Sequence, residues 1–287
     1  MRDATGLLNL LELEQIDTYL FRGNTWDIGS PAVFGGQVLA QSLNAATRTV
    51  EGERFVHSLH GYFILPGDKS IPIIYEVDPI RDGRSFTTRR VVAIQKGRAI
   101  FNMSASFQLE QEGLEHQIDA LNVPPPESLL SSDELAAQYA EIEPWPEDLR
   151  RFYKRDLPIE FRPVEKIDPF NTGKAPPYYH VWIRAKGDMP DNKAAHRQVL
   201  LYASDFRLLM ASLRPHGISP YSKLLRIASL DHAIWFHRDF RIDDWLLYAI
   251  DSPSASNARG LSRGSLFTRD GQLVASVVQE GLLRVRK

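Results

Sequence analysis

The sequence predicts an α+β protein of 287 residues made of two similar halves, each a long helix wrapped by a curved antiparallel β-sheet. Short phrases recur in the same order in both halves: Gln37-Val38-Leu39 matches Gln198-Val199-Leu200, and Tyr75-Glu76-Val77-Asp78 matches Tyr248-Ala249-Ile250-Asp251. In each half a helical pattern precedes several strand-like runs. Chance matching of short words is the alternative, but order and spacing agree as well as identity. We therefore expect a repeated unit.

The first half, residues 1–111, is expected to contain one helix followed by a meander of strands. The helix is predicted over Val33–Thr47. The predicted strands are Phe55–Leu65, Ile71–Asp78, Arg84–Ile94 and Ala99–Leu109, with a further strand at Leu20–Asp27. Asp82-Gly83 and Lys96-Gly97 stand between neighbouring strands and are turn signals.

Residues 112–178 differ in character from the two halves and are interpreted as a bridge. Prolines are frequent here, beginning with Pro124-Pro125-Pro126, and they interrupt regular structure. Within the bridge a short helix is predicted at Glu134–Ala140.

The second half, residues 179–287, repeats the pattern of the first. A strand at Tyr179–Ala185 precedes a helix predicted over Ala194–Leu213, whose apolar residues recur at intervals of three and four, as one buried stripe requires. The predicted strands are Leu230–His237, Trp245–Ser252, Gly260–Thr268 and Leu273–Val285. Arg269-Asp270-Gly271-Gln272 is the clearest hairpin turn in the sequence.

A long helix that covers the apolar concave face of a curved antiparallel sheet is the hotdog arrangement. The repeated pattern therefore predicts a tandem, or double, hotdog. We expect the two sheets to join edge to edge, because this covers strand edges that would otherwise be exposed.

Composition excludes several classes of function. The sequence has no cysteine, so disulfides, zinc–cysteine sites and thiol catalysis are excluded. The formal net charge of −2 gives no field that favours nucleic acid. The N-terminus does not resemble a signal peptide, and no apolar run is long enough for a membrane helix. We expect a cytoplasmic protein without stable membrane insertion.

Three polar residues of the second half are candidates for catalysis. Asp205 lies at the edge of the buried helical stripe, where lost hydration would raise its pKa and suit a general base. Gln279 shares the apolar face of the last strand with Val277, and a buried amide must find partners. Ser229 places a hydroxyl at the start of a predicted strand. Taken singly, each also fits a structural role, such as an ion pair between Asp205 and Arg207.

Other suggestive patterns carry less weight. Asp231-His232 resembles an acid–base pair, but adjacent strand residues point to opposite faces, so at least one of them is expected to be structural. Gly260-Leu261-Ser262-Arg263-Gly264 matches the serine hydrolase elbow, yet a hairpin follows it where the elbow requires a helix. Gly35-Gly36 is too sparse for a dinucleotide fingerprint. The histidines show no metal-ligand spacing, so we predict no metal and no cofactor.

Several longer phrases resemble the bacterial type II acyl-CoA thioesterase family. They are Val33-Phe34-Gly35-Gly36-Gln37, Val56-His57-Ser58-Leu59-His60-Gly61-Tyr62-Phe63, Asp82-Gly83-Arg84-Ser85-Phe86, Asp231-His232-Ala233-Ile234-Trp235-Phe236-His237 and Val277-Val278-Gln279-Glu280-Gly281. The resemblance runs over nearly the whole sequence. It implies a double hotdog that hydrolyses fatty acyl-CoA to a free fatty acid and coenzyme A.

The resemblance also assigns roles to the three candidates. The family's catalytic aspartate falls on Asp205, its hydroxyl residue on Ser229 and its glutamine on Gln279. It implies that Asp205 accepts a proton from a water that the other two hold, although an attack by Asp205 itself is chemically possible.

Four arginines are candidates for binding the phosphates of acyl-CoA, because arginine suits phosphate recognition. They are Arg259, Arg263, Arg89 and Arg90. Each could equally be a solvated strand residue.

Two other functions stay open at this point. A hotdog enoyl-CoA hydratase generally uses an Asp/His pair on the helix, and no histidine follows Asp205 at helical spacing. A non-catalytic acyl-CoA-binding protein is disfavoured by the intact set of three. The first half offers only Gln37, Ser58 and Ala105 at corresponding places, so we expect it mainly to build structure and the acyl tunnel. By analogy with relatives we expect a homo-oligomer, a dimer or tetramer.

Overall fold

The structure is a computed structural model that describes residues 2–142, 156–166, 172–220 and 222–285. The described helices are α1 (Ala4–Leu11), α2 (Gly35–Thr47), α3 (Ser132–Ile142), α5 (Lys193–Ser204) and α6 (Met210–Leu213), with 3-10 helices η1 (Pro126–Ser128) and η2 (Arg214–His216). The described strands are β1 (Glu14–Asp17), β2 (Leu20–Gly23), β3 (Arg54–Phe63), β4 (Ile73–Asp82), β5 (Phe86–Gln95), β6 (Arg98–Leu109), β7 (Ile159–Pro163), β8 (Tyr178–Ala185), β9 (Leu225–Ser229), β10 (Asp231–Phe236), β11 (Leu246–Ser256), β12 (Arg259–Thr268) and β13 (Leu273–Val285).

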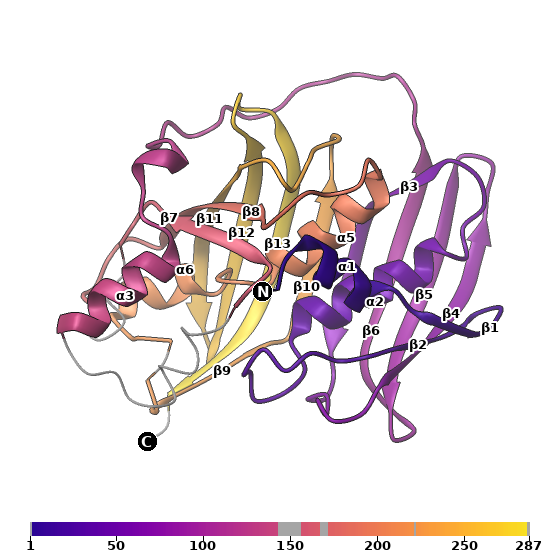
Figure 1. Cartoon of the computed structure of the whole chain (residues 1–287), viewed down its shortest axis with the longest axis horizontal. Coiled ribbons are helices and arrows are strands. Elements are labelled where there is room, and N and C mark those ends of the chain that lie inside the picture. Colours follow the sequence, from indigo (N-terminus) through magenta and orange to yellow (C-terminus); the bar gives the residue numbers. More distant parts are fainter. Residues whose placement is uncertain (1, 143–155, 167–171, 221, 286–287) are drawn as a thin grey trace.

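These strands form one antiparallel sheet that runs through both halves of the chain (Figure 1). The strand order is β1-β2-β4-β5-β6-β3-β10-β13-β12-β11-β8-β7, and β9 pairs with β13 off this path. The halves meet where β3 pairs with β10, with Leu59 opposite Ile234. The predicted edge-to-edge joining is therefore confirmed, and it gives the inner edge strand of each half a hydrogen-bonded partner.

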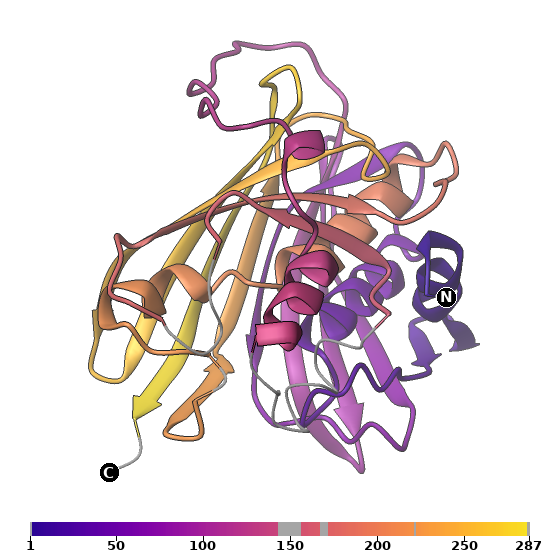
Figure 2. The ribbon, with the colours of Figure 1, turned by 60° about the vertical axis from the view of Figure 1, so that its left-hand side comes forward.

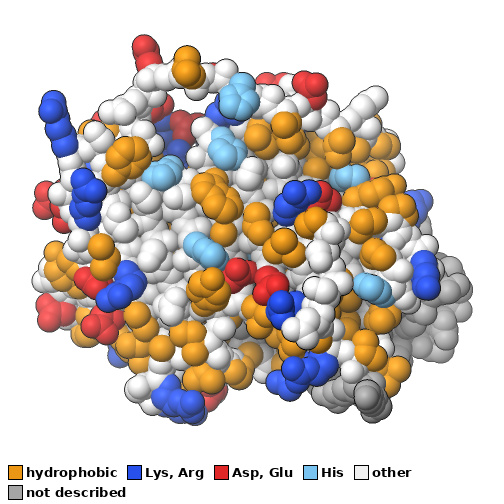
Figure 3. Space-filling model, turned by 180° about the vertical axis from the view of Figure 1, so that it is seen from behind, with side chains coloured by type: hydrophobic (Ala, Val, Ile, Leu, Met, Phe, Trp, Pro, Cys, Tyr) orange, Lys and Arg blue, Asp and Glu red, His pale blue; other side chains and the backbone are white. Residues whose placement is uncertain are grey.

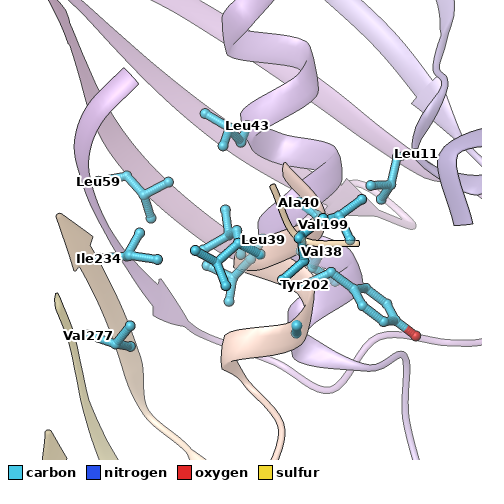
Figure 4. Packing of buried hydrophobic residues seen from close by; sticks show 14 of the residues in the cluster. Leu11, Val38, Leu39, Ala40, Leu43, Leu59, Val199, Tyr202, Ile234 and Val277 are labelled. Carbon is cyan, nitrogen blue, oxygen red and sulfur yellow. The ribbon is translucent and has the colours of Figure 1, made fainter. Parts of the chain in front are cut away.

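Helices α2 and α5 pack against each other on the inner face of this curved sheet (Figure 2). Leu39 and Leu43 of α2 are fully buried, on the side of the helix that faces Leu59 and Ile234 of the central strands (Figure 4). Burying an apolar helix face in this way supplies most of the stability of a helix in a protein. One long helix per half, covered by a curved sheet, is the tandem hotdog predicted from the sequence.

The helix expected over Ala194–Leu213 is interrupted, which corrects the prediction. Helix α5 ends just before Asp205, which is its C-cap, and α6 begins only at Met210. Between them Arg207 has a φ of 65°, in the left-handed region that a right-handed helix cannot contain. The apolar spacing continues across the break, because residues on both sides of it pack into the core. The break places Asp205 at a helix end.

The strand expected at Leu230–His237 also needs correction. The structure has two strands here, β9 and β10, separated by Leu230. Ser229 therefore ends β9, opposite Gly281 of β13, and does not open a strand. No sequence pattern marks β9, because Leu225–Ser229 is mostly exposed and shows no buried alternation.

The other predicted strands, and the helix over Val33–Thr47, are confirmed with shifted ends. The helix expected at Glu134–Ala140 is confirmed as α3. The bridge also supplies β7, which pairs with β8 and extends the sheet, while part of the bridge lies outside the described residues. Arg162 of β7 lies over the Trp245 ring at 5.3 Å, which fastens the bridge to the second half.

The outer face of the sheet is open to solvent around the junction of β3 and β10. Tyr62 is 54% exposed and Trp235 is 42% exposed there. Figure 3 shows the molecule from behind, with hydrophobic side chains and several histidines on this face, together with scattered charged side chains. In the described part of the chain, no helix is long and apolar enough to cross a membrane.

Candidate active site

Asp205 lies where the C-terminal end of α5 meets the N-terminal end of α2. Its Oδ2 accepts a hydrogen bond from the Gly36 N–H at 2.8 Å, and its Oδ1 lies 3.5 Å from the Ser229 hydroxyl oxygen. The Gly36 N–H is one of the groups that a helix leaves unpaired at its start, where negative charge is stabilised. The first half thus contributes a backbone N–H to the surroundings of Asp205, in addition to the structural role expected of it.

Two glycines at the start of α2 make this close approach possible. A Cβ atom on Gly35 would lie 2.8 Å from Asp205 Oδ2, and a Cβ atom on Gly36 would lie 2.4 Å from the Tyr202 carbonyl oxygen. Neither distance is compatible with a real side chain. The Gly-Gly pair is therefore needed where the backbone of one half must reach the carboxylate of the other.

Gln279 and Ser229 complete the predicted set. Gln279 is 1% exposed on the inner face of β13, and its Nε2 donates to Ser229 Oγ at 2.8 Å. The Ser229 hydroxyl in turn donates toward Asp205 Oδ1. The structure therefore brings all three predicted residues together, although Ser229 comes from the end of β9.

His232, which the sequence marked only as part of the Asp231-His232 pair, is a fourth member of this set. It is 0% exposed, and its Nδ1 lies 2.6 Å from Gln279 Oε1. Its Nε2 lies 2.9 Å from Ser204 Oγ, on the last turn of α5. The neighbouring Asp231 points outward and accepts from the Glu280 N–H at 2.6 Å.

The expected opposition of Asp231 and His232 across the strand is thus confirmed. Alternation alone could have placed His232 on the inner face with Ile234 and Phe236, beside the predicted position of Gln279. It could not show which atoms meet there.

Burial shifts the two titratable groups of the site in opposite directions. Loss of water raises the pKa of Asp205, while His232, the Gly36 N–H, Gln279 and Ser229 all favour its charged form. Loss of water also lowers the pKa of His232, against the attraction of Asp205. The carboxylate is therefore a stronger base than an exposed aspartate, and the imidazole is held neutral.

The four candidate arginines do not join this set. Arg259 and Arg263 alternate with the buried Ser262, so they lie on the outer face of β12, opposite to Gln279. Arg259 bonds Glu280 at 2.8 Å, and Arg263 bonds Asp251 at 2.6 and 2.9 Å.

The two arginines of the first half are also paired within the chain. Arg90 bonds Asp78 at 2.6 Å on the outer face of the sheet. Arg89 is 2% exposed and bonds Asp82 at 2.6 Å and the Thr49 carbonyl oxygen at 2.9 Å. A role for the four arginines in phosphate binding stays a prediction.

The serine hydrolase elbow is absent at Ser262, as expected. Ser262 lies inside β12, which leads through a hairpin into β13, so no helix follows it. Its hydroxyl is buried and lies 2.9 Å from Ser212 Oγ of α6. The serine therefore packs α6 against the sheet.

Comparison with known proteins identifies the family of this chain. The family described as "Acyl-CoA thioesterase" matches residues 149–282, and the one described as "Acyl-CoA thioesterase N-terminal domain" matches residues 23–108. The chain is 40% identical over 279 residues to "Acyl-CoA thioesterase 2" of Haemophilus influenzae, covering 97% of both chains. It is 39% identical over 283 residues to human "Acyl-coenzyme A thioesterase 8", covering 96% of this chain and 88% of the relative.

A solved structure gives the same result. The acyl-CoA thioesterase II TesB2 of Mycobacterium marinum is 40% identical and superposes with a TM-score of 0.80, covering 98% of this chain and 99% of the other. Sequence identity, coverage and fold all agree across both halves. The chain therefore belongs to the acyl-CoA thioesterase family, with the double hotdog fold of its type II members.

Proposed function

We propose that this protein hydrolyses fatty acyl-CoA thioesters and that Asp205 is the general base that activates the attacking water. One observation carries the proposal: the carboxylate contacts the Gly36 N–H of one half and lies against the Ser229–Gln279 pair of the other. Family membership supplies the substrate class. The geometry supports a single site built between the halves.

The first step is removal of a proton from water. The Gly36 N–H donates to Oδ2 of Asp205. The other carboxylate oxygen, Oδ1, faces Ser229 and is the one we expect to accept the proton. Ser229 and Gln279 supply a hydroxyl and an amide beside it, which can hold the water in line with the thioester carbon. The raised pKa strengthens the base, since proton transfer improves as the two pKa values approach each other.

The second step is stabilisation of the oxyanion that forms when the water oxygen bonds to the thioester carbon. The N-terminal end of α2 lies beside Asp205, and the Gly35 N–H has no hydrogen-bond partner among the residues that the structure describes. A free amide at a helix start suits a developing negative charge. Collapse of the intermediate then breaks the carbon–sulfur bond. Asp205 returns the proton that it took from water to the sulfur, and coenzyme A leaves as the free thiol.

Direct attack by Asp205 to form an anhydride is the alternative mechanism. It is disfavoured because a nucleophilic carboxylate would not need two water-holding partners beside Oδ1. A non-catalytic binding protein is disfavoured because Asp205, Ser229 and Gln279 are all present and lie together. The predicted cytoplasmic location, the homo-oligomer and the division into residues 1–111, 112–178 and 179–287 remain predictions.

The experiment measures release of free thiol from acyl-CoAs of several chain lengths. We expect hydrolysis by the wild type and losses of about 10²- to 10⁴-fold in kcat for Asp205→Ala and Gln279→Ala. Asp191→Asn is a matched control, since this carboxylate is fully exposed on the surface. A wild type that releases no thiol from any chain length would refute the activity. Two alanine variants with full rates would refute the site.

A further inference from the structure

His232 is a fully buried histidine that the proposed proton transfer does not use. It lies between two polar groups, with Gln279 Oε1 at 2.6 Å from Nδ1 and Ser204 Oγ at 2.9 Å from Nε2. The Tyr248 hydroxyl donates to the Ser204 carbonyl oxygen at 3.0 Å, which fixes this end of α5. Both ring nitrogens are therefore engaged, with the site on one side and the helix end on the other.

The contacts define which nitrogen carries the proton. Nδ1 faces an amide oxygen, which can only accept, so Nδ1 must donate a hydrogen. In a neutral ring Nε2 is then an acceptor, and the Ser204 hydroxyl can donate to it. The titratable groups around the ring are Asp205 at the C-cap of α5, the neighbouring Asp231 and His60 on β3. Burial of the ring opposes a second proton.

This arrangement has a consequence for the amide of Gln279. Because Oε1 is held by His232, Nε2 must point the other way, where it donates to Ser229 Oγ at 2.8 Å. Ser229 then has its own hydrogen free for Asp205 or for the water. An amide rotated by half a turn would present its oxygen to Ser229, and the serine hydrogen would be diverted from Asp205.

We propose that His232 is a positioning residue that fixes the orientation of the Gln279 amide through its Nδ1–H, with Ser204 holding the opposite ring nitrogen. The chain of contacts runs from Ser204 through His232, Gln279 and Ser229 to Asp205, which follows Ser204 in the sequence. In this proposal the ring acts through Gln279 and takes no part in the proton transfer. The kinetic readout of this inference rests on the proposed function, but its structural readout does not.

The kinetic experiment compares two replacements of His232. His232→Leu removes the donor, and we expect kcat to fall about 100-fold with little change in KM, because a misplaced catalytic group has effects of that size. His232→Asn restores an N–H near the position of Nδ1, so we expect it to keep kcat within about 5-fold of wild type. Equal losses of kcat in His232→Leu and His232→Asn would contradict the inference. They would show that the packing of the imidazole ring matters and the hydrogen bond from Nδ1 does not.

A double-mutant cycle tests whether His232 acts through Gln279. If it does, adding His232→Leu to Gln279→Leu will change kcat by less than about 3-fold, because the amide to be oriented is already gone. If the loss of kcat in the double variant equals the product of the two single losses, His232 and Gln279 have independent roles and the inference is overturned.

The structural experiment needs no substrate. Nitrogen-15 NMR of the imidazole in the wild type is expected to show a neutral ring with the proton on Nδ1. A proton on Nε2 alone would overturn the inference even if the enzyme were active. If the ring carries its proton on Nδ1 but the protein releases no thiol, the contact between His232 and Gln279 stands and the proposed activity is refuted. The NMR result also decides the matter if His232→Leu does not fold.

Discussion

Helices α2 and α5 pack against each other in opposite directions, and side-chain hydrogen bonds join them at two places. At one place Asp205 accepts from the Gly36 N–H. At the other, Asn44 near the end of α2 donates to Gln198 in the middle of α5 at 3.2 Å, so two neutral amides meet. A carboxylate that faces the start of a helix is found only at the first of these two places.

The sheet shows the same difference. Gln279 of β13 faces the site, whereas the corresponding strand of the first half, β6, has the buried Ala105. Gln37, suggested by the sequence as the counterpart on the helix, instead accepts from the Trp26 N–H at 3.1 Å and has a structural role. In the proposed site, the second half supplies Asp205, Ser229 and Gln279, and the first half supplies the helix start that faces the carboxylate.

The largest expected effect comes from making the two places alike. Asp205→Asn puts an asparagine at the first place, as Asn44 is at the second. We expect kcat to fall about 10³- to 10⁴-fold. Adding Asn44→Asp moves a carboxylate to the other place, where Ala105 stands in for Gln279. Steady-state thiol release should therefore remain as low as in Asp205→Asn. Recovery of activity in the double variant would mean that the two places are equivalent.

The glycine contact is expected to give the next largest effect. Gly35→Ala places a methyl group against Asp205 Oδ2 and should lower kcat about 100-fold by displacing the carboxylate. Gly113→Ala is a matched control, because a Cβ there meets nothing within 4 Å. Kinetics of both variants, with a thermal unfolding curve for each, separate a local shift from loss of the fold. Full activity of Gly35→Ala would break the proposed link between the halves.

The serine hydroxyl should matter less. Ser229→Ala removes the group between Gln279 and Asp205, and a loss of about 10- to 100-fold in kcat is expected, while Ser229→Thr keeps the hydroxyl and most of the rate. Ser58→Ala, at the place that the sequence suggested as its counterpart, should have no effect on thiol release. A loss in Ser58→Ala as large as in Ser229→Ala would remove the asymmetry between the halves.

The smallest expected effect is on stability. The folded-state pKa of Asp205 is raised, so the folded protein binds this proton more tightly than the unfolded chain does. Stability is therefore lost as pH rises from the unfolded-state pKa of about 3.9 through the folded-state pKa. Asp205→Asn should be more stable than wild type near neutral pH by about 1 kcal/mol. Urea unfolding at pH 4 and pH 8 checks this, and an advantage that shrinks with rising pH would contradict it.

The sequence predicted the repeated helix and strands well, because hydrophobic period and turn residues are local signals. The positions of the three catalytic candidates alone also fit structural roles, and only the resemblance to a family favoured catalysis for all three. The end of α5 at Asp205 was missed because the apolar spacing continues past Arg207. The Gly36 contact joins residues far apart in the sequence, and no local pattern could indicate it.

The measurement that tests the central claim most directly is the pH dependence of kcat/KM for an acyl-CoA substrate, in wild type and Asp205→Asn. A base at Asp205 requires that kcat/KM rise with pH to a plateau, with an apparent pKa above that of an ordinary aspartate. The residual activity of Asp205→Asn should lack this rise. If Asp205→Asn keeps the same rise and plateau, the base lies elsewhere, and a site built between the two halves around Asp205 is wrong.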